Sequence, residues 1–274
     1  NRKANYAGLL QDEGEFDRSE ALYRDCFGKA QQLADVHQIA RVGINLANLL
    51  TTLGELAEAR EIAEVVFRHS LQHGLTHGGV KVQLVLLEAA IESEHYRAAR
   101  RHCESVREDI ERIDDAVVRG EHSILEARLL VAESDVEGAI EKLARLGVPD
   151  VSGLAVRLAM ERVACEAAMP SGSRSVQRAE ELTETMLGMT EDAHDELRWR
   201  ALAYHAAVAS ESEVAKRSRH AASSVLKRFL ESLSAPRRET YMATRRRREQ
   251  RSWLDTGSVS SPLLHSETDN HYRR

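Results

Sequence analysis

The stretch GELAEAREIA, residues 54–63, carries the pattern that decides the fold. Glycine opens it, an aliphatic residue follows two positions later, and alanine stands five and nine positions beyond the glycine. The same pattern recurs in steps of 40 residues, as GEFDRSEALY at 14–23, EHYRAARRHC at 94–103, SDVEGAIEKL at 134–143 and RSVQRAEELT at 174–183. A fixed period of about 20–50 residues is typical of stacked structural repeats.

One position of the repeat carries a small side chain every time. Five residues beyond the start of each stretch stand Ser19, Ala59, Ala99, Ala139 and Ala179. Four residues later, one helical turn along the same face, stand Tyr23, Ala63, Cys103, Leu143 and Thr183. Two antiparallel helices joined by a tight turn come close only where a contact position is small. The sequence therefore predicts helix pairs that turn near Gly14, Gly54, Glu94, Ser134 and Arg174.

The residues at the turns support this interpretation. Gly14 and Gly54 permit a left-handed backbone that other residues resist. Ser134 followed by Glu137 has the pattern of a capping box at the start of a helix.

The repeat resembles the tetratricopeptide family over about residues 1–235. The small position and its partner match best, whereas Tyr6-Ala7, Leu46-Ala47 and Leu86-Leu87 stand where the family carries tryptophan and a Leu-Gly pair. The spacing also exceeds the family's usual period of about 34 residues. The resemblance therefore points to the long-repeat kind found in large bacterial signalling ATPases, kinases and transcription regulators. A different solenoid of helix pairs is the structural alternative.

The fold class that follows is all-α, an α-solenoid of about six stacked antiparallel helix pairs over residues 1–235. The sixth pair is out of register, with its first helix over 193–209 and its second helix ending near Leu233. Pro236 is placed to start a further helix, so residues 236–254 are expected to form a basic C-terminal capping helix. The polar, serine-rich residues 255–274 are expected to be disordered.

Composition excludes several classes of protein. The net charge of -6 gives no general attraction to nucleic acid or anionic membranes. Three widely separated cysteines, Cys26, Cys103 and Cys165, form no disulfide framework, which favours a reducing cytoplasmic location. The most apolar stretch, residues 82–91, is about half as long as a membrane span and contains Glu88, so no membrane contact is expected. The chain begins in helical pattern, which suggests a piece of a longer polypeptide.

No motif indicates catalysis, so we predict that the protein is not an enzyme and uses no cofactor. Gly28-Lys29 lacks the earlier glycine of a phosphate-binding loop. The best metal candidate is His69 with His73, one helical turn apart, and His77 beyond Gly74. Histidines also suit the negative pole at the end of a helix, and we predict no metal site.

The tetratricopeptide resemblance implies that first helices line a concave groove that binds a peptide or a protein. The candidate groove residues are Arg41, Asn45, Asn48, Lys81, Glu88 and Arg128. Asn5, Asn45 and Asn48 match in type the asparagines of the family's carboxylate-binding members, but the full cationic set is absent. The predicted function is a protein–protein interaction scaffold, as the regulatory or docking segment of a larger bacterial signalling protein whose partner the sequence does not specify.

A basic stretch supplies the alternative function. Residues 237–251 hold seven arginines and two glutamates, with a continuous run from Arg245 to Arg248. Such a helix could contact phosphates, which would make the protein a nucleic-acid-binding transcription regulator. We instead expect a solvated capping helix, or one that pairs with the acidic array, and no nucleic-acid partner.

Overall fold

The structure is a computed structural model that describes residues 2–147, 152–169, 175–209 and 212–256. These residues form fifteen helices and no strand. Six antiparallel pairs account for most of them: α1 (Arg2–Asp12) with α2 (Phe16–Gln32), α3 (Val36–Leu53) with α4 (Leu56–Gln72), α5 (Thr76–Glu92) with α6 (Tyr96–Ser105), α8 (Ala116–Ala132) with α9 (Val136–Ala144), α10 (Ser152–Ala168) with α11 (Val176–Met189), and α12 (Asp195–Val208) with α13 (Ser212–Ser232). The remaining helices are α7 (Arg107–Arg112), α14 (Ala235–Ala243) and α15 (Arg245–Thr256). The predicted all-α solenoid is confirmed.

The turns between paired helices share one backbone conformation. Gly14 and Gly54 have φ angles of 80° and 83°, which confirms the reason for glycine at these positions. Glu94 and Ser134 adopt the same left-handed region, with φ of 61° and 69°, although they carry a Cβ. Arg174, at the fifth turn, lies outside the described residues.

The capping box expected at Ser134 is wrong by one residue. Ser134 follows the C-cap of α8 in a left-handed conformation, the position that commonly ends a helix. The N-cap of α9 is Asp135, whose side chain accepts a hydrogen bond from the backbone N–H of Gly138. The chain therefore needs Ser134 to finish one helix and cannot also use it to start the next.

The small repeat position is a point of close helix contact, as predicted. All five residues at this position are 0% exposed: Ser19, Ala59, Ala99, Ala139 and Ala179. In the first pair the hydroxyl of Ser19 donates a hydrogen bond of 2.7 Å to the carbonyl oxygen of Ala7, which shows how closely α1 and α2 approach. The partner position one turn later is also buried throughout, in Tyr23, Ala63, Cys103, Leu143 and Thr183.

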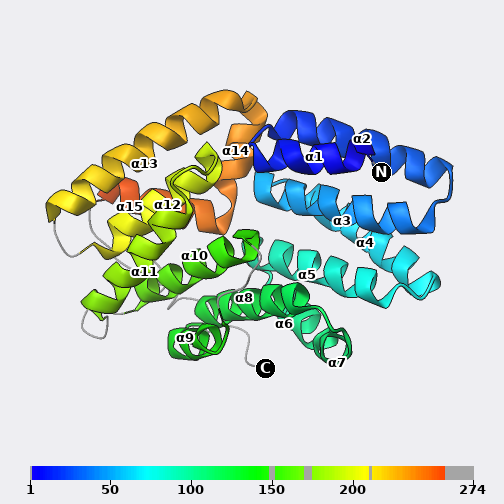
Figure 1. Cartoon of the computed structure of the whole chain (residues 1–274), viewed down its shortest axis with the longest axis horizontal. Helices are drawn as coiled ribbons and strands as arrows, with labels where there is room; N and C mark the ends of the chain where they lie inside the picture. The colour runs from blue at the N-terminus through cyan, green and yellow to red at the C-terminus, as the bar shows by residue number, and fades with distance from the viewer. Residues whose placement is uncertain (1, 148–151, 170–174, 210–211, 257–274) are drawn as a thin grey trace, which may run out of the picture.

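The two ends of the solenoid meet, so the array forms a closed ring (Figure 1). Phe16 at the start of α2 packs edge-on against His194, at 5.4 Å between ring centroids, and against Phe229 of α13, at 5.9 Å. Arg237 of α14 pairs with Asp17 and, at 2.6 Å, with Glu20 of α2. One hydrophobic cluster therefore contains residues of both the first and the last repeats.

Two helices stand where a single capping helix was expected over residues 236–254. The chain breaks at Thr244, which has extended backbone angles of φ −65° and ψ 147°. Before the break, α14 covers the turn between α3 and α4 so closely that a Cβ at Gly54 would lie 2.6 Å from the carbonyl oxygen of Thr240. After it, α15 turns to pack against α12 and α13. Two different docking directions require the break. Residues 257–274 of the expected tail lie outside the described residues.

Candidate functional site

The 40-residue period stacks equivalent side chains of the first helices along the concave side. Asn48 of α3, Glu88 of α5 and Arg128 of α8 occupy one register position, and Arg128 forms an ion pair with Glu88, 40 residues away. Arg41, Lys81, Glu121 and Glu161 occupy a second register position. Such columns place residues from different repeats within contact distance on one surface.

Two adjoining cavities lie on this surface. The first, of about 180 Å³, lies among α3, α5, α8 and α10. Its polar lining includes four residues predicted for the groove, Asn45, Asn48, Lys81 and Glu88, and its apolar lining is Ile44, Leu84, Val85, Val117 and Leu125. The second, of about 290 Å³, shares Asn48, Glu88 and Arg157 with the first and extends toward α12, α15 and Thr244, which lies between α14 and α15.

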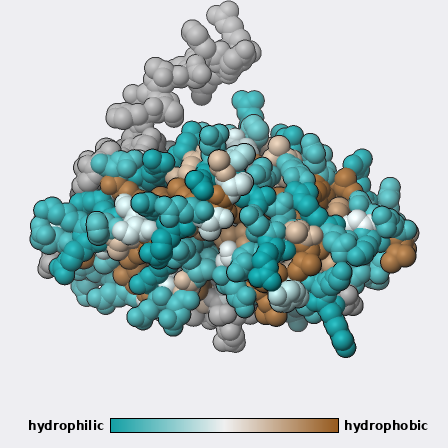
Figure 2. Space-filling model, turned by 90° about the horizontal axis from the view of Figure 1, so that it is seen from above, coloured by the Kyte–Doolittle hydropathy of each residue, from teal (hydrophilic) through white to brown (hydrophobic). Residues whose placement is uncertain are grey.

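One face of the outer surface can be judged by its hydropathy (Figure 2). It is mainly hydrophilic, with small separated apolar areas (Figure 2). Among the described residues, no helix combines the length and the apolar composition that a bilayer span requires.

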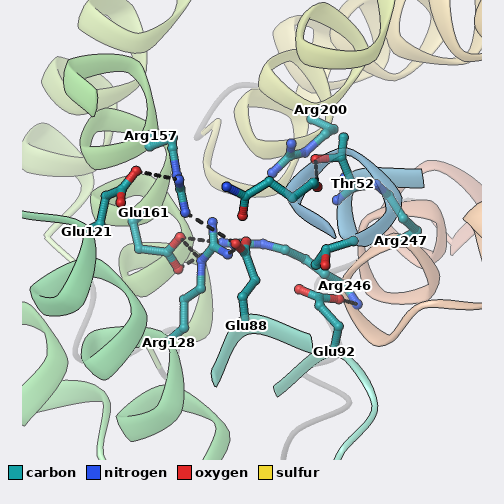
Figure 3. A network of polar contacts seen from close by, with 12 residues as sticks. Thr52, Glu88, Glu92, Glu121, Arg128, Arg157, Glu161, Arg200, Arg246 and Arg247 are labelled. Carbon is teal, nitrogen blue, oxygen red and sulfur yellow. Dashed lines mark hydrogen bonds and ion pairs between the residues drawn. The ribbon is translucent and has the colours of Figure 1, made fainter. Parts of the chain in front are cut away.

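A buried ion network lies beside the second cavity (Figure 3). Arg128 bonds through Nε to Glu161 at 2.8 Å, and Arg246 of α15 donates from Nη2 to both oxygens of Glu161, each at 2.8 Å. Arg157 lies 3.4 Å from Glu88. Burial raises the pKa of Glu88, but Arg157 and Arg128 outweigh it and lower that pKa to about 2. Glu88 is therefore ionised at neutral pH.

A second buried network joins α12 to the C-terminal helices. Glu196 accepts a hydrogen bond of 2.7 Å from Arg247, one of 3.1 Å from the hydroxyl of Tyr241, and one of 3.2 Å from Arg200. Trp199 donates from its indole nitrogen to Tyr241 at 3.0 Å. Burial raises the pKa of Glu196, but Arg200 and Arg247 lower it further, to about 2. The charge of Glu196 thus stabilises the position of α15.

The structure separates the six predicted groove residues into three environments. Asn45, Asn48, Lys81 and Glu88 lie together around the first cavity. Arg128 is buried in the ion network and lines the second cavity. Arg41 is absent from the lining of both cavities and instead bonds to Asn5 at 3.0 Å and to Gln38 at 2.9 Å. Whether any of them binds a partner stays a prediction.

The histidine cluster considered as a metal candidate is split. The rings of His69 and His73 lie 4.5 Å apart, but His77 points to α8, where its Nε2 is 2.8 Å from Asp115. A different trio that the sequence did not suggest, Cys103, His122 and Glu126, comes together instead.

Other groups of the same chain already bond to members of this trio. Glu126 pairs with Lys142 at 2.6 Å, and His122 Nε2 lies 3.3 Å from the carbonyl oxygen of Cys103. Burial raises the pKa of the Cys103 thiol to about 11, which keeps it neutral. We interpret the trio as packing between α6, α8 and α9.

The arginine run pairs with side chains of the array, which is one of the two arrangements that we expected. Arg246 and Arg247 are buried in the two networks. Arg245 lies over the ring of Tyr96, at 5.7 Å from the centroid, and Arg248 pairs with Glu94. A nucleic acid would have to displace these contacts to reach the guanidinium groups of Arg246 and Arg247.

Sequence reasoning missed much of the ion network. Glu161 shares its register position with Lys81, so the 40-residue columns could have indicated it. Arg157, Glu196 and Arg200 have no such signal. Arg246 reaches Glu161 across 85 residues, which no local pattern indicates.

The protein is an all-α, tetratricopeptide-like helical solenoid with two cavities described on its concave side. No protein-family model matches the chain, and the curated proteins include no significant match. Among solved structures, the chain is similar to a Rap protein crystallised in complex with competence and sporulation factor. The two are 11% identical, with a TM-score of 0.64, over 93% of this chain and 75% of that chain. At this identity the likeness shows the fold.

Proposed function

We propose that the protein is an interaction scaffold that binds an extended peptide segment of its partner along the concave groove. The observation that carries this is the cavity of about 180 Å³, whose lining combines Asn45, Asn48 and Lys81 with apolar side chains. Clefts that combine apolar side chains with placed polar groups are typical of ligand sites. Side-chain amides can both donate to and accept from a peptide backbone.

The fold supports the same proposal. A Rap protein of similar architecture was crystallised with competence and sporulation factor, so this fold accommodates a bound factor in that protein. A regulatory or docking segment of a bacterial signalling protein would use the groove in this way: the partner contributes the signal, and the ring supplies a preformed surface.

Phage-displayed 12-residue peptides selected on the purified chain provide the test. We expect Asn48→Ala combined with Lys81→Ala to weaken the selected peptides about 30-fold or more, because anchoring contacts at an interface cost about 2 kcal/mol or more. Asn48 is exposed and Lys81 half-buried, so helical circular dichroism should be retained.

The matched control is Arg60→Ala with Arg68→Ala on the exposed face of α4. This variant should bind the selected peptides with unchanged affinity, as measured by isothermal titration calorimetry. Peptides that bind the groove variant normally and lose affinity for the α4 variant would refute the groove. A selection that yields no specific peptide would refute the proposal as a whole.

A further inference from the structure

A third cavity, of about 230 Å³, lies outside the concave groove. It lies among the end of α4, the start of α5 and the junction of α6 and α7, and it shares no lining residue with the two cavities described above. Figure 1 shows α4, α6 and α7 on the side of the ring opposite α15. A ligand in this cavity would therefore be separate from a peptide in the groove.

Five apolar side chains line this cavity and come from α4, the start of α5 and the bend between α6 and α7. They are Phe67, Leu71, Leu75, Val80 and Val106. Leu71 is 65% exposed, so the apolar lining continues to the protein surface. A ligand that covers this surface removes it from water, which favours the binding of an apolar body.

The volume of the cavity limits the size of that apolar body. In another protein an apolar cavity of about 150 Å³ binds benzene, so about 230 Å³ holds one six-membered ring with a short chain. Gly79 of α5 keeps part of this volume open. A Cβ at Gly79 would have its nearest neighbour at 3.9 Å, so alanine, the better helix former, would fit there without a clash. The missing side chain therefore leaves room that the backbone does not require.

The charge of the lining indicates which polar group such a ligand carries. Asp109 of α7 is the charged side chain among the described residues of the lining. It is 43% exposed, so a ligand can reach its carboxylate. Its ion-pair partner Arg112 lies 3.4 Å away and is 70% exposed, which makes this pair weak. With a carboxylate and no cation in the described lining, the cavity attracts a cation and repels an anion.

We propose that this cavity binds a small amphiphilic amine, with a ring-sized apolar body and an ammonium group on a short chain. The apolar body covers Leu71 and Val80, and the ammonium group pairs with Asp109. Thr76 and Ser105 are exposed residues of the same lining, and their hydroxyl oxygens can accept further hydrogen bonds from the ammonium group. The inference goes beyond the proposed function, because it stands or falls without a peptide in the groove.

Titrations of the intact chain, followed by nuclear magnetic resonance, test this site with three probes of similar size. We expect 2-phenylethylamine to bind saturably at millimolar concentrations, as suits so small a ligand. The alcohol 2-phenylethanol keeps the apolar body and lacks the charge, so it should bind roughly 5-fold more weakly or worse. Phenylacetate, an anion, should bind more weakly than the alcohol, because Asp109 repels it.

Two substitutions test the apolar body and the charge separately. Gly79→Leu fills the cavity and should abolish binding of the amine. Gly28→Leu in α2 is its matched control, because a Cβ at Gly28 has no neighbour within 4 Å. Asp109→Asn should make the amine and the alcohol bind with nearly equal affinity. Glu108→Gln, at a side chain that is 85% exposed on the same helix and does not line the cavity, should preserve the preference for the amine.

If Gly79→Leu fails to fold, Gly79→Ala takes its place and should weaken the amine, because its Cβ enters the same volume. An amine that does not saturate on the wild-type chain would overturn the site. Equal affinity of the wild-type chain for the amine and the alcohol would overturn it too. Amine binding that survives Gly79→Leu would mean that the ligand binds elsewhere, and the proposal would then be wrong.

Discussion

Gly54 and Ser134 adopt the same left-handed backbone conformation, although only Ser134 carries a Cβ. Both lie at the turn of a helix pair, and both have positive φ, of 83° and 69°. Gly54 has the additional constraint that α14 lies against it. Ser134 is exposed and has no such neighbour. The same repeat position therefore carries steric strain in one pair and a close tertiary contact in another.

Substitutions at these two residues should change stability in opposite directions. Ser134→Gly removes a left-handed strain of about 1–2 kcal/mol and gives back about 0.4–1 kcal/mol of chain entropy, so we expect a gain of about 0.5–1 kcal/mol. Gly54→Ala adds the strain and a Cβ 2.6 Å from the Thr240 carbonyl oxygen, so it should cost about 1 kcal/mol or more. Urea unfolding measures both, and a destabilised Ser134→Gly chain would count against the turn assignment.

At the scale of the element, α15 combines a buried and an exposed arginine face. Arg246 and Arg247 lie in the ion networks. Arg251 is exposed and forms an ion pair of 3.7 Å with Asp255, which is also exposed. The helix is therefore a structural part of the ring, positioned by charges that belong to α10 and α12.

Arg246→Gln should destabilise the protein far more than Arg251→Gln. Removing one partner of a buried ion pair costs about 3–5 kcal/mol, because the other charge stays buried. Exposed pairs contribute about 0–1 kcal/mol. The two variants differ only in position along one helix, so the comparison of their urea midpoints is internally controlled. Equal midpoints would mean that α15 is not docked in solution.

The sequence predicted the elements whose contacts are local and repeated. The 40-residue period located the helix pairs, and the small side chains at Ala59 and Ala99 identified the close contacts. It did not predict where α15 lies, because the contact between Arg246 and Glu161 spans 85 residues and follows no period. Four of the six groove residues meet around one cavity because equivalent repeat positions stack, whereas the burial of Arg128 depends on that unpredicted helix.

At the scale of the whole molecule, the buried carboxylates make stability depend on pH. The pKa of both Glu88 and Glu196 is about 2 in the folded chain, below their ordinary value of 4.5. Their contribution is complete above about pH 4.5 and is lost as the pH falls toward about 2. Burial raises the pKa of Glu121 and of Glu249, which act in the opposite direction.

We therefore expect the free energy of unfolding to decrease between about pH 4.5 and pH 2, by roughly 3 kcal/mol for each lowered carboxyl group. Urea unfolding at a series of pH values measures this. Glu88→Gln should flatten the acid limb, while Glu141→Gln on the exposed face of α9 should leave its slope unchanged. A slope that Glu88→Gln does not alter would contradict the assignment.

The closure of the ring changes how the repeats depend on one another. In an open solenoid each terminal repeat has a single neighbour, and stability is a sum along a line. Here Phe16 contacts Phe229, so the first and last repeats are also neighbours. Each terminal repeat therefore packs against two other repeats. We therefore expect less fraying at the two ends than in an open solenoid. We expect local opening to begin in the middle of the chain, where α7 and α9, of 6 and 9 residues, pack on two smaller hydrophobic clusters.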